Sequence, residues 1–315
     1  MGLYTNRECA IGIDLGATNI KAGLIATNGT TLLHDVVATN ASSGREPLLR
    51  KLTDLIESYI QVAFERNLTI VGIGIGTAGY VNRQGIVGEA TGNLPGWTGI
   101  DLSTELRERF HYRIAVDNDV KVLAAGEMWL GAGRCWSDFL CVTLGTGVGG
   151  CIISNKSVYH GRDGYAGAIG HQVIMHGGLP CTCGLRGCWE QYASVTALIR
   201  MAGSIAVADE AEETISPERL FDLARAGDEA STGIIDRYAE YVALGLANLI
   251  HIFNPPAILF GGAITEQGDF LFDRIRGHVD ALTMRAYTTP PVAILSAELG
   301  EMAGVIGAAS LVITE

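Results

Sequence analysis

Two spacings of apolar residues alternate along this chain. A mostly apolar run at 9–25, broken by the turn Asp14-Leu15-Gly16-Ala17-Thr18, predicts a strand, a glycine turn and a second strand. The pair Asn28-Gly29 then predicts a type I′ hairpin turn into a third strand over 31–39. Between 46 and 67, apolar residues recur every three or four positions, which predicts an amphipathic helix. The pattern indicates an α/β protein.

The rest of the chain continues this alternation. Short apolar runs predict strands at 70–75, 113–116, 258–260 and 292–295, and a strand–turn–strand unit at 139–153. Helical spacing and capping residues predict helices at 101–110, 118–130, 192–206, 216–226, 228–253, from about 268, and at 301–312.

The second half of the chain begins as the first does. Thr143-Leu144-Gly145-Thr146-Gly147 follows a strand in the same way as the turn at 14–18, so we expect an internal duplication. Two such α/β units facing each other would leave a cleft with both glycine turns pointing into it. We predict a smaller lobe at 1–117 plus the C-terminal helix 301–315, and a larger lobe at 118–300.

Composition narrows the class of protein. The chain has 315 residues, of which 48% are apolar and 18% charged, as in a well-cored globular protein of two domains. A net charge of −12 argues against binding to nucleic acid or a membrane surface. The seven cysteines lie in apolar runs or in one loop, a usage typical of the reducing cytoplasm. We find no secretory leader and no long uncharged apolar run, so we expect a cytoplasmic protein.

The loop after residue 170 carries the most specific chemistry. Cys181, Cys183 and Cys188 form a C-x-C-x4-C array, and His171 lies upstream of it. Three thiolates and one imidazole complete the tetrahedral shell of a structural Zn²⁺ and leave no open position for catalysis. The alternative is three reduced cysteines in a core beside a surface histidine. The glycine-rich loop composition favours zinc.

Both glycine turns are candidates for phosphate binding. Backbone N–H groups of such turns approach phosphate oxygens closely, and the hydroxyls of Thr18 and Thr146 can also donate. Asp14, at the end of the first strand, suits Mg²⁺ held through water. Neither turn matches a P-loop or opens a helix as a Rossmann turn does. Each alone is more typical of a tight hairpin than of a binding site, but two copies favour phosphate binding.

Three further polar residues have two interpretations each. Asp119, after Asp117-Asn118, is either part of a helix cap or a general base that deprotonates a substrate hydroxyl. Glu190 is either a favourable acid at a helix N-terminus or a substrate contact. Asn93, in the loop Asn93-Leu94-Pro95-Gly96-Trp97, is either a turn residue or a substrate contact.

With these motifs in place, the whole chain resembles the ROK family (repressor, open reading frame, kinase), and within it the bacterial ATP-dependent glucokinases. The resemblance rests on residues 14–18, 93–97, Asn118-Asp119, 144–150, Gly170-His171 with the three cysteines, Glu190 and Gly261-Gly262.

The resemblance implies an actin-like ATPase (ribonuclease H-like) fold in two lobes, with ATP, Mg²⁺ and structural Zn²⁺. It assigns Asp119 as the base for the 6-hydroxyl of a hexose. It assigns the sugar to Gly79, Asn93, Asn118, His171 and Glu190. It assigns the nucleotide to Asp14, Gly16, Thr18, Gly145, Thr146, Gly147, Gly261 and Gly262. One ring nitrogen of His171 would bind zinc and the other would face the sugar. Family members are commonly homodimers or homotetramers.

Two departures from the family bear on function. The first turn has Ala17 where many members have a second glycine, a modest restriction of the turn. The family's sugar signature Gly-Glu-x-Gly-His reads Gly167-Ala168-Ile169-Gly170-His171 here. A hydrogen bond to a charged group contributes about 1.5–3 kcal/mol, so losing the glutamate would weaken glucose binding by roughly ten- to a hundredfold unless another group compensates.

The sequence therefore predicts an ATP-dependent hexose kinase, with glucose ahead of N-acetylmannosamine, N-acetylglucosamine or another modified sugar. A sugar-sensing regulator of the same family is the alternative from another class. Its members carry a winged helix-turn-helix before the first strand, and only about eight residues precede that strand here. A sensor without catalysis would not need Asp119.

Overall fold

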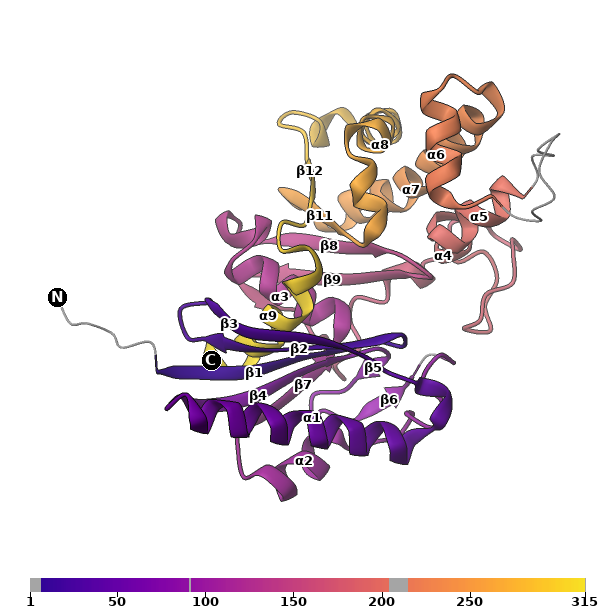
Figure 1. Cartoon of the computed structure of the whole chain (residues 1–315). Helices are drawn as coiled ribbons and strands as arrows, with labels where there is room; N and C mark the ends of the chain where they lie inside the picture. Colours follow the sequence, from indigo (N-terminus) through magenta and orange to yellow (C-terminus); the bar gives the residue numbers. More distant parts are fainter. Residues whose placement is uncertain (1–6, 91, 204–214, 315) are drawn as a thin grey trace. The chain divides into compact units, whose positions relative to one another are not determined.

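The computed structural model describes residues 7–90, 92–203 and 215–314. The chain divides into two compact units, which Figure 1 shows with their elements labelled. The first unit comprises the described residues up to Ser137, the segment Ile153–Ala166, and the described residues from Glu298 onward. The second comprises Asp138–Ile152 and Gly167–Ala297.

The first unit is built on a mixed five-stranded sheet with the order β3-β2-β1-β4-β7. Its strands are β1 (Glu8–Leu15), β2 (Asn19–Ala26), β3 (Thr31–Ala38), β4 (Thr69–Thr77) and β7 (Ile114–Asn118). The hairpin strands β1, β2 and β3 pair antiparallel, whereas β4 runs parallel to β1 and β7 parallel to β4. The carboxyl ends of β1, β4 and β7 therefore meet at one edge, where polar residues follow each strand.

Helices cover both faces of this sheet (Figure 1). They are α1 (Arg45–Glu65), α2 (Leu102–Phe110), α3 (Asp119–Trp129) and α9 (Ala303–Ile313). A short hairpin of β5 (Tyr80–Val81) and β6 (Val87–Glu89) lies between β4 and α2 in the chain. Helix α9 lies directly on β1 and β4. Side chains at Gly12 and Gly74 would prevent this, because a Cβ there would lie 2.1 Å from Val305 O and 1.7 Å from Ala308 O.

The predicted type I′ turn at Asn28-Gly29 is wrong. The Gly29 N–H donates to Ala26 O over 2.8 Å, so the central turn residues are Thr27 and Asn28. Of these three, Gly29 alone has a positive φ, 89°. A tight turn followed by a glycine in the left-handed region makes a three-residue hairpin loop, in which the extra residue is taken up as a bulge.

The second unit repeats the strand order of the first, as β10-β9-β8-β11-β12. Its strands are β8 (Phe139–Leu144), β9 (Val148–Ser154), β10 (Ser157–Val158), β11 (Ala257–Gly261) and β12 (Ala293–Ser296). Strand β11 runs parallel to β8 and to β12. From Ile153 onward, the end of β9 and all of β10 pack with the first unit. The same order around a leading hairpin is the duplication that the two glycine turns indicated.

Within the described residues, five helices pack with this sheet around an apolar core that contains Trp189, Leu246 and Phe260. They are α4 (Glu190–Ala193), α5 (Val195–Ala202), α6 (Pro217–Arg225), α7 (Glu229–Phe253) and α8 (Asp269–Leu282). Short 3-10 helices occupy Ala41–Ser43, Ala132–Cys135, Ile169–His171, Ala263–Gln267, Arg285–Tyr287 and Gly300–Met302.

The helix expected over 192–206 is broken. Ser194 is extended (ψ 160°) and its side chain accepts the N–H of Ala197, so it ends α4 and caps α5. Residues 204–206 of that predicted helix lie outside the described residues.

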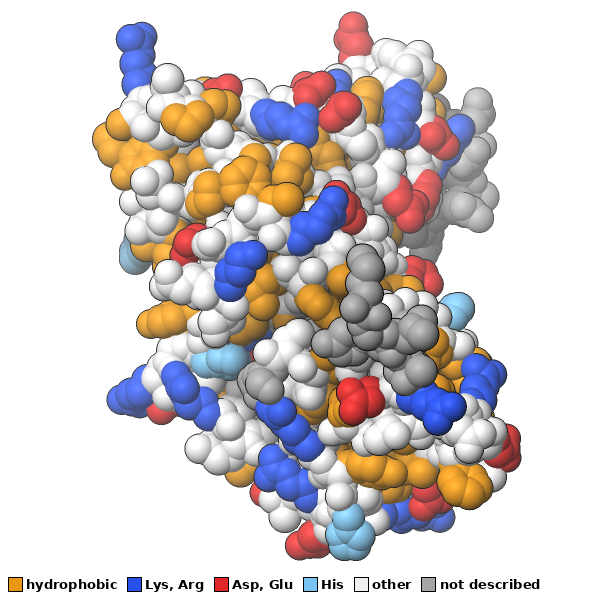
Figure 2. Space-filling view, turned by 90° about the vertical axis from the view of Figure 1, so that its left-hand side faces the viewer, with side chains coloured by type: hydrophobic (Ala, Val, Ile, Leu, Met, Phe, Trp, Pro, Cys, Tyr) orange, Lys and Arg blue, Asp and Glu red, His pale blue; other side chains and the backbone are white. Residues whose placement is uncertain are grey.

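The predicted lobes, divided at residues 117–118, stay a prediction, because units of compact packing need not coincide with bodies that move. In the described part of the chain no helix is long and apolar enough to cross a membrane. On the face shown in Figure 2, acidic and basic side chains are interspersed.

Candidate functional site

Four of the predicted site residues come together at the carboxyl edge of the first sheet: Asp14, Gly79, Asn118 and Asp119. Asn118 ends β7 and caps α3, its side-chain oxygen accepting the N–H groups of Val120 and Lys121. Its amide nitrogen donates to Gly79 O over 2.9 Å and to Asp119 Oδ1 over 2.7 Å. Gly79 has a φ of 107° and lies against Glu89 O, so this position requires glycine. Asp119 is therefore the first residue of α3 and not its cap.

Burial and a second carboxylate raise the pKa of Asp119. Desolvation is the larger cause, the nearby Asp14 carboxylate adds to it, and the pKa reaches about 7. Burial also raises the pKa of Asp14, and Lys21 partly offsets this. Asp119 Oδ1 accepts both the Val120 N–H and the Asn118 amide. Both of these bonds are made to Oδ1, so Oδ2 is the oxygen on which a substrate proton could be received.

A buried network of charged residues is bonded to the turn that carries Asn118 and Asp119. Asp117 Oδ1 accepts the N–H of Asn118 over 2.8 Å, and Asp117 Oδ2 lies 2.6 Å from His160 Nε2. The ammonium of Lys121 lies 3.8 Å from Asp117 Oδ1 and donates to Gly164 O. Asp117 and Lys121 are 6% and 4% exposed, so removing either would take the opposite charge away from a buried ionised group. The network ties the loop around residues 160–164 to the turn that carries Asp119.

The first glycine turn, Gly16–Thr18, is held through its carbonyl groups. The hydroxyl of buried Thr39 donates to Gly16 O over 2.6 Å, and the Thr39 N–H donates to Thr18 O over 2.8 Å. Within the described residues, no protein group accepts the N–H of Ala17 or Thr18. Such a turn presents donors to an anion while its acceptors are occupied.

The loop that carries Asn93 is anchored by apolar side chains. Leu94 and Trp97 are 2% and 0% exposed, and the indole N–H of Trp97 donates to Thr77 Oγ1 over 3.0 Å. Asn93 itself is exposed. The anchored loop therefore displays Asn93 to solvent, and no described contact joins it to Asp119.

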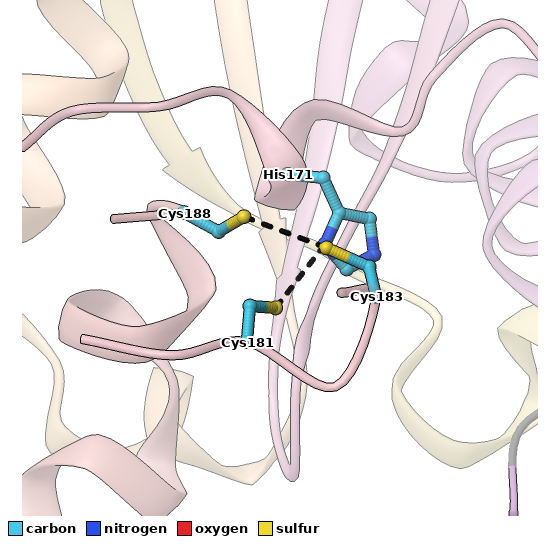
Figure 3. Close-up of side chains that lie close together, drawn as sticks. All are labelled: His171, Cys181, Cys183 and Cys188. Atoms are coloured by element: carbon cyan, nitrogen blue, oxygen red, sulfur yellow. Dashed lines mark hydrogen bonds between the residues drawn. The ribbon is translucent and has the colours of Figure 1, made fainter. Parts of the chain in front are cut away.

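The second unit gathers the predicted metal ligands. His171 lies on the 3-10 helix that follows Ala168, and the three cysteines lie on the next loop. Figure 3 shows the four side chains converging on one point. All four ligand atoms lie within 4.8 Å of one another; Cys183 Sγ lies 3.6 Å from Cys188 Sγ, and Cys181 Sγ lies 3.7 Å from His171 Nδ1.

These separations fit zinc. Metal–ligand bonds of about 2.3 Å to sulfur and about 2.0 Å to nitrogen give tetrahedral edges of about 3.8 Å between sulfurs and about 3.5 Å between sulfur and nitrogen. Burial raises the pKa of the Cys188 thiol to about 12, and the neighbouring Cys183 adds to this effect. A bound dication would reverse that effect, because it stabilises thiolates directly. Nδ1 of His171 faces the three cysteines, and Nε2 lies across the ring.

Glu190 lies between the cluster of His171 and the three cysteines and the second glycine turn. Its Oε2 accepts the N–H of Val148 over 3.1 Å, and its Oε1 lies 3.8 Å from Cys181 Sγ. A Cβ at Gly147 would lie 2.4 Å from Glu190 Oε2, so a side chain in the turn would displace this carboxylate. Gly262 (φ 100°) lies against the carbonyl oxygen of Leu144, the residue before the turn. Gly145–Gly147, Gly262 and Glu190 are thus neighbours in the second unit.

Sequence analysis missed the residues that support these sites. Thr39 and Thr196 each donate a hydroxyl proton to a carbonyl of a glycine turn, and Asp117, Lys121 and His160 form the buried network. A threonine hydroxyl has no local sequence signal of its function. Lys121 offered a weak signal, because a lysine within the apolar stretch of a short helix needs a buried partner.

Comparison with known proteins gives a consistent result. The model of the ROK family matches residues 10–315. A glucokinase from Halalkalibacterium halodurans is 34% identical over 317 residues, which cover 96% of this chain and 94% of that protein. A xylose repressor from Bacillus spizizenii is 30% identical over 309 residues, covering 96% of this chain and 77% of the repressor.

Among solved structures, a ROK family glucokinase from Streptomyces griseus in complex with glucose and AMPPNP superposes with a TM-score of 0.81. It is 33% identical, and the match covers 96% of this chain and 98% of that one. The mixed α/β sheets of the present chain match this sugar-kinase, actin-like fold, which confirms that part of the expected fold class. The zinc-binding loop stays a prediction.

Proposed function

The chain belongs to the ROK family, and from this premise we propose that it transfers the γ-phosphoryl group of ATP to the primary (6-) hydroxyl of a hexose, with glucose as the first candidate. The observation that carries the proposal is the environment of Asp119. This carboxylate has a pKa of about 7, one oxygen fixed by Val120 and Asn118, and a second oxygen outside those bonds. A general base requires such a group.

In the proposed reaction Asp119 Oδ2 accepts the proton of the sugar hydroxyl as the hydroxyl oxygen attacks the γ-phosphorus of ATP. The bond from phosphorus to the bridging oxygen breaks, and ADP leaves with that oxygen. Asn118 and Gly79 keep the base oriented. The N–H groups of the turns at 16–18 and 145–147 are proposed to hold phosphate oxygens. Mg²⁺, for which Asp14 is the proposed ligand through water, would neutralise phosphate charge when bound.

For the sugar we propose contacts from Gly79, Asn93, Asn118, His171 Nε2 and Glu190. His171 Nδ1, Cys181, Cys183 and Cys188 are proposed to hold structural Zn²⁺, which fixes the tautomer and direction of the imidazole. The adenosine side of the nucleotide is assigned to Gly261 and Gly262, next to the second glycine turn.

Ala168 favours a second candidate within the same class. It lies exposed at the start of the 3-10 helix that carries His171, where the family signature has glutamate. Without that carboxylate, an N-acetylated or otherwise modified hexose can place a different substituent there. A sugar-sensing regulator, the activity named for the xylose repressor relative, would bind sugar without turnover.

A direct test measures ADP release with Mg-ATP and glucose, mannose, N-acetylmannosamine, N-acetylglucosamine, allose or fructose, for the unaltered chain and for Ala168→Glu. We expect Ala168→Glu to lower KM for glucose by about ten- to a hundredfold, because a charged acceptor is added.

Strong turnover of glucose by the unaltered chain, with little gain in Ala168→Glu, would mean that another group replaces the missing carboxylate. Turnover of a different sugar alone would assign specificity to position 168. The absence of turnover with every sugar would reject the kinase proposal in favour of a sensor.

The pH dependence provides an independent check on the base. The proton can be accepted only by ionised Asp119, so kcat/KM should rise with pH and level off above about pH 7. The measurement is the initial rate from pH 5.5 to 8.5 at constant ionic strength, with Mg-ATP saturating. A flat profile, or one that falls with increasing pH, would contradict Asp119 as the base.

A further inference from the structure

The segment Glu190–Thr196 holds the second glycine turn at three points. Glu190 Oε2 accepts the N–H of Val148 over 3.1 Å, as described above. The N–H of Val195 donates to Gly145 O over 2.8 Å. The hydroxyl of Thr196 donates to Thr146 O over 2.9 Å. The segment thus holds the carbonyl groups of Gly145 and Thr146 and the N–H of Val148.

The other end of the same segment is attached to the metal cluster. It begins two residues after Cys188, which is fully buried, and the Gln191 N–H donates to Cys188 O over 3.0 Å. Cys181 Sγ accepts the Gln191 side-chain amide over 3.6 Å and lies 3.8 Å from Glu190 Oε1. The segment is therefore in contact with the sulfur of Cys181 and with the backbone of Cys188.

Fixing the carbonyl groups leaves the turn's amides as the groups that face a ligand. Within the described residues, no protein group accepts the N–H of Thr146 or Gly147. Because the turn is already ordered by Val195 and Thr196, less conformational entropy is lost when these amides meet an anion. The carbonyl groups of the first turn are held in a similar way, by the hydroxyl and the N–H of Thr39.

We propose that the metal cluster sets the affinity of the second glycine turn for nucleotide phosphate, acting through Glu190–Thr196, with Thr196 as a positioning residue. This inference rests on the proposed function, in which that turn binds ATP. The metal would then affect nucleotide binding as well as the orientation of His171. Since coupling between two bound species is reciprocal, nucleotide must raise the affinity for the metal by the same factor.

The experiment measures the Kd of AMPPNP by calorimetry, without sugar, for the zinc-loaded chain, Thr196→Val and the zinc-stripped chain. Losing one hydrogen bond to the turn should weaken binding by about three- to tenfold in Thr196→Val, with zinc content unchanged. We expect removal of zinc to weaken binding by at least the same factor, and re-addition of zinc to restore it. Thr232→Val is the matched control, because Thr232 donates to Asp228 O over 2.8 Å within α7.

A second measurement covers the case in which the zinc-stripped chain unfolds. The rate of zinc loss to a chelator should fall when AMPPNP is present in the unaltered chain, and this protection should be smaller in Thr196→Val. Equal AMPPNP affinity in Thr196→Val and Thr232→Val, or zinc loss that is indifferent to AMPPNP, would overturn the inference.

The two proposals fail differently. If the chain releases ADP in the presence of sugar, but its affinity for AMPPNP depends on neither zinc nor Thr196, the kinase proposal holds and the coupling is rejected. No AMPPNP binding by the zinc-loaded chain rejects the kinase, and the coupling with it.

Discussion

Asp119→Asn is expected to lower kcat by about 10²- to 10⁴-fold, the usual contribution of a general base. The substitution is nearly isosteric. Its side-chain oxygen can still accept the N–H of Val120 and the amide of Asn118, as Asp119 Oδ1 does over 2.9 and 2.7 Å. The amide nitrogen that replaces Oδ2 cannot accept a proton. The loss should therefore appear in kcat, with KM for the sugar little changed.

The same variant should fold as well as the unaltered chain. The cap of α3 is Asn118, which is retained. The pKa of Asp119 is raised from 3.8 to about 7, so the folded state binds the proton more tightly than the unfolded state does. Ionised Asp119 therefore destabilises the fold as pH rises from about 4 to 7. At pH 8 the Tm of Asp119→Asn should therefore equal or exceed that of the unaltered chain. If the folded variant turned over sugar at a near-normal rate, Asp119 would not be the base.

Cys188→Ser is expected to have the largest effect on stability. Cys188 is fully buried and is a proposed zinc ligand, so its loss should release the metal. We expect the free energy of unfolding to fall by about 4 kcal/mol or more, since loss of a bound metal belongs to the most damaging class of single changes. The measurements are zinc per chain by mass spectrometry and the denaturant midpoint.

Cys9→Ser is the matched control for this effect. Cys9 is also fully buried, in β1, and is outside the cluster. It should lose some stability through the buried hydroxyl and keep its zinc. If the unaltered chain contained no zinc after purification from zinc-supplemented medium, or if Cys188→Ser retained it, the metal assignment would be wrong.

What the sequence could predict depended on how local the determining interactions are. Strands β1, β4, β8 and β11 were readable because each is a short apolar run that ends in glycine or a polar turn. The Cys3His cluster could be predicted because the residue types and their spacing along the sequence are enough to suggest a metal site. The duplication followed from two similar turns.

The errors arose where a distant group decides the local structure. The helix expected over 192–206 breaks at Ser194, partly because the next N–H, on Val195, donates to Gly145, about fifty residues earlier. The turn at Asn28-Gly29 was assigned from a dipeptide preference, whereas the register of β2 with β3 places a bulge at Leu24/Ile25. The hairpin β5–β6 has strands of two and three residues, too short to produce a periodic pattern.

Helix α9 has a consequence for the order in which the chain can fold during synthesis. Its residues Ala303–Ser310 are buried against β1, β4 and α3, elements complete by residue 129. A ribosome adds about 5–20 residues per second, so the sheet of the first unit stays without this cover for many seconds, while the second unit emerges. The nascent N-terminal sheet therefore presents an apolar face of the kind that chaperones bind. Translation speed between residues 130 and 303 should then affect the yield of folded protein.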